Sequence, residues 1–104
     1  MENILHEALN LHSDLKESGT IKDPDDYAGI NNSIYSLIIS LYQWSQTTDE
    51  HIRTGHLYVS LIHLDRVEFE LKALDFPEGW KDLDIIFREI CVLRQSIYSL
   101  VLNN

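Results

Sequence analysis

The sequence predicts an all-α protein, an antiparallel up-down-up-down four-helix bundle, and three observations support this prediction. Apolar residues recur at steps of three and four in four long segments, which is the period of one face of an α-helix. Only a few residues, rich in Gly, Pro, Asp and Thr, separate the segments. No segment shows the alternation typical of a strand. Short connections make successive helices antiparallel, and four such helices close most simply into a bundle.

The chain has the size of one domain. Its 104 residues suffice for one hydrophobic core and are too few for two. The apolar fraction of 44% and the charged fraction of 24% are typical of a folded globular chain. We therefore expect a single helical domain over residues 1–104, with helices at about 2–18, 24–46, 48–74 and 82–102.

The first two helices have clear ends. The first is expected to end at Gly19, because glycine readily adopts the left-handed conformation that closes many helices. The second begins with Asp23 as N-cap, Pro24 in the first helical position, and Asp25 and Asp26 in the first turn, where the helix dipole favours carboxylates. The predicted core stripes of these helices are Ile4, Ala8, Leu11 and Leu15, then Tyr27, Ile30, Ile34, Leu37, Leu41 and Trp44.

The last two helices follow the same rules. Thr47 and Glu50 have the spacing of a capping box at the start of the third helix, and Asp82 can cap the fourth. Glu68 and Lys72 are placed for an exposed ion pair. The predicted core stripes are Leu57, Leu61, Leu64, Val67, Leu71 and Leu74, then Leu83, Ile86, Ile90, Leu93, Ile97 and Leu100.

The formal net charge of −9 is concentrated in the N-terminal half. Up to residue 50, nine acidic residues accompany two lysines, whereas the remainder carries eight acids and six Lys or Arg residues. Such a field repels nucleic-acid phosphates and anionic lipids and accelerates encounter with basic proteins. The sequence therefore predicts a basic protein partner, without direct nucleic-acid or membrane binding.

The sequence shows no export or membrane signal. The N-terminus lacks the pattern of a signal peptide, and no apolar run reaches the roughly 20 residues of a membrane span. Cys91 is the single cysteine, so no intramolecular disulfide can form, and we expect a cytoplasmic protein. Because Cys91 follows the core residue Ile90, it is expected to be buried as a small apolar side chain.

Two groups of residues are candidates for binding. Four carboxylates surround the first connection and are either a solvated helix start or a recognition patch for Lys and Arg: Glu17, Asp23, Asp25 and Asp26. A second apolar stripe on the second helix is either additional core or a partner or homodimer interface, since tyrosine-rich patches are frequent at interfaces: Tyr35, Ile38, Ile39 and Tyr42. The fourth helix has a similar excess in Ile85, Val92 and Leu102.

Metal, cofactor and catalytic chemistry find little support. Asp49, His56, His63 and Glu70 recur every seven residues, but neighbours on that line lie roughly 10.5 Å apart along the helix axis and cannot share one ion. The sequence contains no Glu-x-x-His motif and no glycine-rich phosphate loop. We therefore expect no metal site, no cofactor and no enzymatic activity.

Three functions from different classes are compatible with these features. The preferred hypothesis is an acidic protein-binding module that neutralises a basic partner, of the inhibitor, immunity or antitoxin type, with electrostatic steering of association. One alternative is a DNA mimic, which requires rows of carboxylates at phosphate-like spacing. Another is a homo-oligomeric bundle that binds a small ligand, which requires polar groups among the core stripes.

Overall fold

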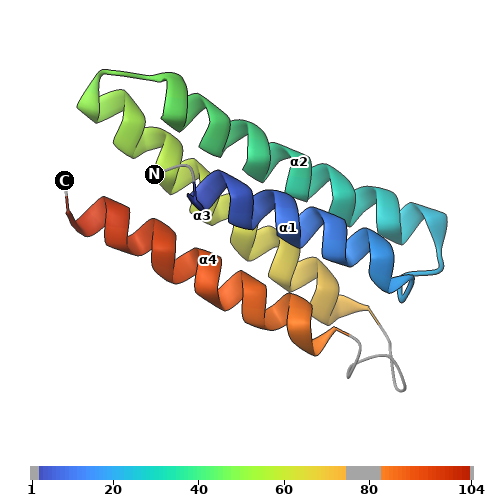
Figure 1. The fold of residues 1–104 in the computed structure, drawn as a ribbon. Helices are drawn as coiled ribbons and strands as arrows, with labels where there is room; N and C mark the ends of the chain where they lie inside the picture. Colours follow the sequence, from blue (N-terminus) through green and yellow to red (C-terminus); the bar gives the residue numbers. More distant parts are fainter. Residues whose placement is uncertain (1–2, 75–82, 104) are drawn as a thin grey trace.

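The computed structural model describes residues 3–74 and 83–103, and it confirms the four-helix bundle. The helices are α1 (Asn3–Ser18), α2 (Pro24–Gln46), α3 (Glu50–Ala73) and α4 (Asp84–Leu102). Each helix packs on its neighbours in the chain, and α4 also packs on α1. Among the described residues, the backbones of the diagonal pairs, α1 with α3 and α2 with α4, do not approach one another. Successive helices run in opposite directions, so the start of α1 and the end of α4 lie at the same end of the bundle (Figure 1).

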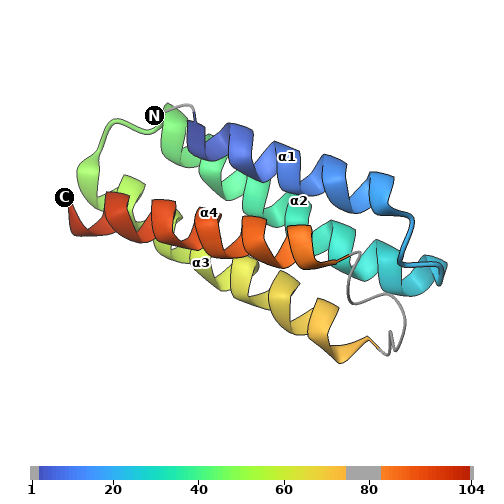
Figure 2. The ribbon, with the colours of Figure 1, turned by 60° about the horizontal axis from the view of Figure 1, so that its bottom comes forward.

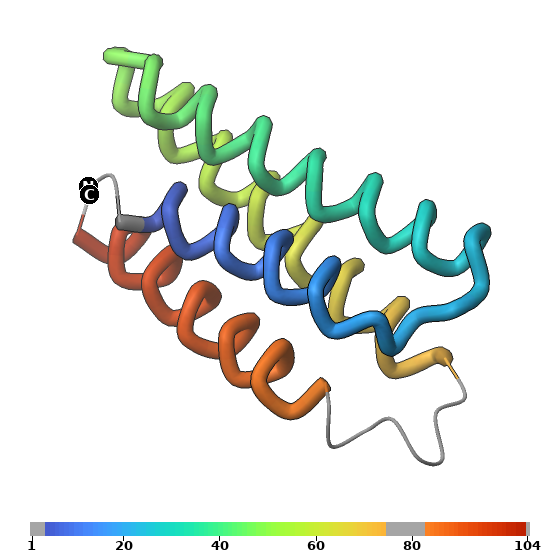
Figure 3. The backbone as a smooth tube through the Cα atoms, turned by 45° about the vertical axis from the view of Figure 1, so that its right-hand side comes forward, coloured from blue at the N-terminus to red at the C-terminus, as the bar shows by residue number. Residues whose placement is uncertain are grey.

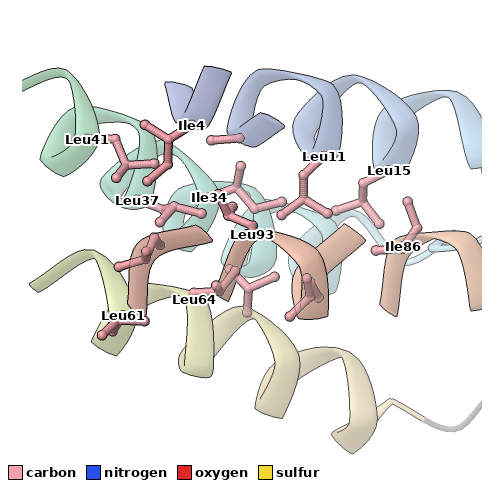
Figure 4. Packing of buried hydrophobic residues seen from close by; sticks show 14 of the residues in the cluster. Ile4, Leu11, Leu15, Ile34, Leu37, Leu41, Leu61, Leu64, Ile86 and Leu93 are labelled. Atoms are coloured by element: carbon pink, nitrogen blue, oxygen red, sulfur yellow. The ribbon is translucent and has the colours of Figure 1, made fainter. Parts of the chain in front are cut away.

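The core is one cluster of buried apolar side chains from all four helices (Figure 4). Every apolar residue that is buried in the described part of the chain belongs to a predicted stripe. Three other predicted members, Tyr27, Leu74 and Leu100, are only partly buried because they lie near helix ends. The three-four spacing therefore identified the inward face of every helix.

The first connection has the predicted caps. Gly19 adopts a φ of 61°, the left-handed conformation expected after α1. Oδ1 of Asp23 accepts hydrogen bonds from the backbone N–H groups of Asp25 at 2.8 Å and Asp26 at 3.1 Å, and Pro24 is the first residue of α2. These bonds satisfy amides that have no acceptor within the helix.

The predicted capping box of α3 is wrong. Oγ1 of Thr47 donates instead to the carbonyl of Gln43 at 2.7 Å, at the end of α2. The N-cap is Asp49, whose Oδ1 accepts from the N–H groups of His51 at 3.0 Å and Ile52 at 3.2 Å. A carboxylate is favoured over a hydroxyl at this position because it also interacts with the helix dipole. The helix consequently begins at Glu50 rather than at residue 48.

The third connection differs slightly from the prediction. The third helix ends at Ala73, with Leu74 in an extended conformation, rather than at residue 74. The fourth begins at Asp84 after Leu83, which makes no side-chain cap hydrogen bond. The predicted cap, Asp82, lies outside the described residues.

The helices α2 and α3 form the most extensive contact of the bundle and run side by side over their whole length (Figure 3). Small residues permit this approach: Ser33 and Ser40 on α2 and Ser60 on α3 are buried. Their hydroxyls are all used, because Ser33 donates to Oε1 of Glu70 at 2.6 Å, and Ser40 and Ser60 donate to backbone carbonyls at 3.0 and 2.6 Å. These hydrogen bonds therefore offset the cost of removing the three hydroxyls from water.

Candidate functional site

The predicted acidic cluster lies at one end of the bundle, where α1 passes into α2. Glu17 occupies the last turn of α1, and Asp23, Asp25 and Asp26 form the start of α2; all four are exposed. Asp23 also has a structural task, because its carboxylate caps α2. No ion pair of the described residues involves the other three carboxylates. They are therefore open to a cationic group from outside.

The predicted apolar stripe of α2 is divided by the structure. Tyr35, Ile39 and Tyr42 are 47%, 54% and 54% exposed, so they are not additional core. Ile38, in contrast, is partly buried and packs against the core. The exposed members follow one another at steps of four and three, which places them on one face of the helix. An apolar, tyrosine-containing face therefore looks outward from α2.

Residues of α1 extend this face, and sequence reasoning missed them. The ring of His12 lies 4.9 Å from the ring of Tyr35, at an interplanar angle of 47°. Leu9 is three residues before His12, which places it on the same side of α1, and it is 45% exposed. The contact of His12 with α2 shows that this side of α1 borders the stripe. The sequence feature that could have indicated this extension is the pair Leu5 and Leu9, which lies beside the core stripe of α1.

The acidic cluster and the apolar face share one helix but do not overlap. From Asp26 to Tyr35 the helix advances nine residues, or about 14 Å at 1.5 Å per residue. Within α2 there is no lysine or arginine, and Asp25 and Asp26 are its only acids. The surface of α2 therefore changes from negative at its start to apolar and uncharged over its second half.

Polar groups elsewhere in the bundle serve the packing of helices. Nη2 of Arg94 donates to Oδ1 of Asp65 at 2.9 Å and to Oε1 of Glu68 at 2.6 Å, and Lys72 lies 3.3 Å from Glu68. Burial alone would raise the pKa of Glu68, but the hydrogen bonds and charges of Arg94 and Lys72 outweigh it and lower the pKa below its usual value. This network joins α3 to α4.

At the contact of α1 with α4, two acids, Asp14 and Glu89, face each other and form no ion pair with a described residue. Burial, a hydrogen bond with Asp14 and the negative charge of Asp14 raise the pKa of Glu89 to about 7. Oε2 of Glu89 is buried and receives no hydrogen bond from a donor of the described residues. Two carboxylates can only accept, so a hydrogen bond between them requires that one carries a proton.

The residues of the histidine line of α3 remain spread along one side of the helix. Within the described residues, no group of three or more His, Cys, Asp or Glu side chains is placed to hold an ion. His63 is half-buried, and burial together with the positive charge of Arg66 lowers the pKa of His63. Oε1 of Glu70 accepts a hydrogen bond from the hydroxyl of Ser33 of α2.

The expected burial of Cys91 is wrong, because its side chain is exposed. The residue follows Ile90 by one position, a rotation of about 100° around the helix axis, which carries it off the core stripe.

None of the described helices combines the length and apolar content needed to cross a bilayer.

The fold and its surfaces define a four-helix bundle protein with an acidic end and an exposed apolar face. Comparisons of the chain with known protein families, with curated proteins and with solved structures give no match.

Proposed function

We propose that this chain is a non-enzymatic protein-binding module that neutralises a basic partner, as inhibitor, immunity and antitoxin proteins do. The observation that supports this most is the outward apolar face of α2, Tyr35, Ile39 and Tyr42, on a helix with acidic residues at its start and no basic ones. Exposed apolar patches that contain tyrosine are frequent at protein interfaces. The acids would attract a basic partner, and the apolar face would provide the contact that holds it.

The two alternatives have less support. A DNA mimic needs carboxylates in rows, but the exposed acids of α2 stop after Asp26. A small-ligand bundle needs unsatisfied polar groups within its core. The fully buried polar residues of the described chain are three serines, and each of their hydroxyls donates a hydrogen bond within the bundle. Four buried side-chain atoms have no hydrogen-bond partner in the described chain, but they belong to residues that are only partly buried and lie outside the core cluster: Glu7, Asn31, His63 and Glu89.

The test begins with capture of partners from extract of the source cells on the tagged protein, followed by purification of any basic protein that high salt releases. Binding of that protein is then measured with the double variant Tyr35→Lys/Tyr42→Lys. We expect at least about a tenfold loss of affinity, mainly through faster dissociation, because apolar contact area is lost. The matched control is Ile85→Lys/Val92→Lys, which changes the charge equally at exposed positions of α4.

The role of the acidic cluster is tested separately with Asp25→Asn/Asp26→Asn. These changes leave the cap residue Asp23 intact, so α2 should keep its start. We expect slower association at low salt and little change at high salt, because salt screens the attraction. The proposed surface would be contradicted if the α2 and α4 lysine variants lost equal affinity for the partner. An unchanged association rate of Asp25→Asn/Asp26→Asn would contradict the role of the acidic cluster.

A further inference from the structure

The third helix, α3, is apolar on two opposite faces. Its inner face belongs to the core, and its outer face carries more exposed large apolar residues than any other described helix: Ile52 55%, Tyr58 52%, Val59 41%, Ile62 60% and Phe69 72%. A helix that is apolar all round is usually covered on every side. In the described part of the bundle only the inner face is covered, so the outer face has the character of an interface.

The spacing of the outer face indicates what fits it. Its central line runs at steps of three, four, three, four and three, which is the pattern of a coiled-coil seam: Ile52, Gly55, Val59, Ile62, Arg66 and Phe69. This series of steps is the same when read from either end. An antiparallel copy of the same helix therefore meets it in register, with Val59 of each copy opposite Ile62 of the other.

Gly55 supplies an independent observation. It lies within α3 on the outer seam, it does not have a positive φ, and a Cβ added to it would meet nothing within 4 Å. Nothing in the described chain thus requires a glycine, although glycine destabilises a helix interior relative to alanine. In the antiparallel alignment Gly55 lies opposite Arg66 of the second copy, so the smallest residue of the seam faces the longest.

Charge also favours a second copy at this face. Along α3, four carboxylates are accompanied by three Lys or Arg residues and three histidines, so this helix contributes little to the net charge of −9. Two copies that meet along α3 therefore repel one another less than at the acidic end. Tyr58 and Asp65 lie seven residues apart on one margin of the seam. Antiparallel packing brings the hydroxyl of each Tyr58 near Asp65 of the other copy, where the carboxylate can accept a hydrogen bond.

From these observations we infer that the outer face of α3 is the contact surface of a symmetric homodimer, in which two α3 helices pack antiparallel with Val59 opposite Ile62 and Gly55 opposite Arg66. The surface is separate from the α2 face assigned to the basic partner. Dimer formation and partner binding can therefore succeed or fail independently.

Sedimentation velocity over a range of concentrations tests the dimer. The wild-type chain should sediment with twice the monomer mass of 12.1 kDa. Val59→Glu and Ile62→Lys, each alone, should raise the dissociation constant at least about a hundredfold, because each dimer would then bury two unpaired charges. Both residues are more than 40% exposed, so the helical circular dichroism should not change. The matched control Val92→Glu places a charge on α4 and should leave the dimer intact.

Mixing the two variants tests the register. Each proposed dimer contains two contacts between a Val59 and an Ile62. In a mixed dimer, one contact pairs the introduced glutamate of one copy with the introduced lysine of the other, and the second contact keeps its native Val59 and Ile62. The mixture should therefore dimerise although neither variant does so alone. A wild-type chain that stays at 12.1 kDa, a Val59→Glu dimer as tight as the wild type, or a mixture that remains monomeric would each overturn the proposed interface.

Discussion

The helix α4 packs against α1 on one side and α3 on the other (Figure 2), and the carboxylates at these two contacts are stabilised in different ways. Toward α3, Arg94 binds Asp65 and Glu68, and the pKa of Glu68 falls. Toward α1, Glu89 faces Asp14, and the pKa of Glu89 rises to about 7. Both helix contacts place carboxylates at the edge of the core, where charge needs a partner. Where α4 provides the guanidinium of Arg94, Glu68 stays ionised to a lower pH. Where α4 provides Glu89 instead, this carboxyl binds a proton below about pH 7.

The largest expected effect comes from Arg94→Ala. Its side chain and that of Glu68 are each 22% exposed, so the change leaves a half-buried carboxylate without its main partner. We expect a loss of about 2 kcal/mol in the free energy of unfolding at pH 7, measured by urea denaturation. Arg88→Ala breaks a pair whose side chains are 77% and 56% exposed and should cost less than about 0.5 kcal/mol.

The same variant should change the response to acid. Because the pKa of Glu68 is lower in the folded chain than its ordinary 4.5, this group stabilises the fold above about that pH, and the stabilisation is lost as the pH falls through the folded pKa. In Arg94→Ala, the free energy of unfolding should therefore depend less on pH in this range, because Glu68 no longer has its main cationic partner. Equal effects of the Arg94 and Arg88 variants would show that the network resembles an ordinary surface pair.

A smaller effect of opposite sign is expected for Glu89→Gln. The pKa of Glu89 is raised from 4.5 to about 7 on folding, so between these values the folded chain binds more protons than the unfolded chain, and stability falls as the pH rises. Glutamine carries no charge at any pH. Because Glu89 is only partly buried, solvent screening reduces the effect of the shift. The variant should therefore be more stable than the wild type by about 1 kcal/mol at pH 8 and nearly equal to it at pH 5.

Thermal or urea unfolding at the two pH values measures this difference. Glu17→Gln, at an exposed position of α1, is the control and should not show the same pH dependence. If Glu89→Gln were destabilising at pH 8, Glu89 would have to be held as a carboxylate by a donor, and the contrast between the two sides of α4 would disappear.

The smallest effect is expected for Lys72→Ala. Lys72 is 57% exposed and pairs with Glu68 at 3.3 Å, one helical turn away. Exposed pairs of this kind contribute about 0.3 to 0.5 kcal/mol, and Arg94 would still bind Glu68. A double-mutant cycle with Glu68→Gln measures the coupling, and a value above about 1 kcal/mol would place Lys72 within the network rather than at its margin.

The sequence was sufficient for the core because an inward helix face has a local signature. The stripes of all four helices were predicted from their steps of three and four, and the bounds of α2 from Asp23, Pro24 and the residues after Gln46. The start of α3 was not, because two capping residues compete within three positions and the sequence does not rank them. Oγ1 of Thr47 had a nearer acceptor in the carbonyl of Gln43, which left the cap to Asp49.

The candidate surfaces were predicted less completely, because periodicity does not say which apolar residues have neighbours. It indicated a second stripe on α2, but only packing shows that Ile38 touches the core and that Tyr35 meets His12 of α1. The periodicity did not predict the exposed apolar face of α3, since a neighbouring helix could have covered each residue of that face. It placed Cys91 next to a core position, and one residue of rotation exposes it.

By itself, the sequence determined the class of the protein: four amphipathic helices, their order, their inward faces and an acidic N-terminal half. These properties depend on residues close together in the chain, whose spacing fixes a face before any helix meets another. Tertiary structure alone decided which charges meet: Arg94 with two acids of α3, and Glu89 with an acid of α1. Those partners are distant in the chain, so their pairing and the surfaces left uncovered arise only when the helices pack.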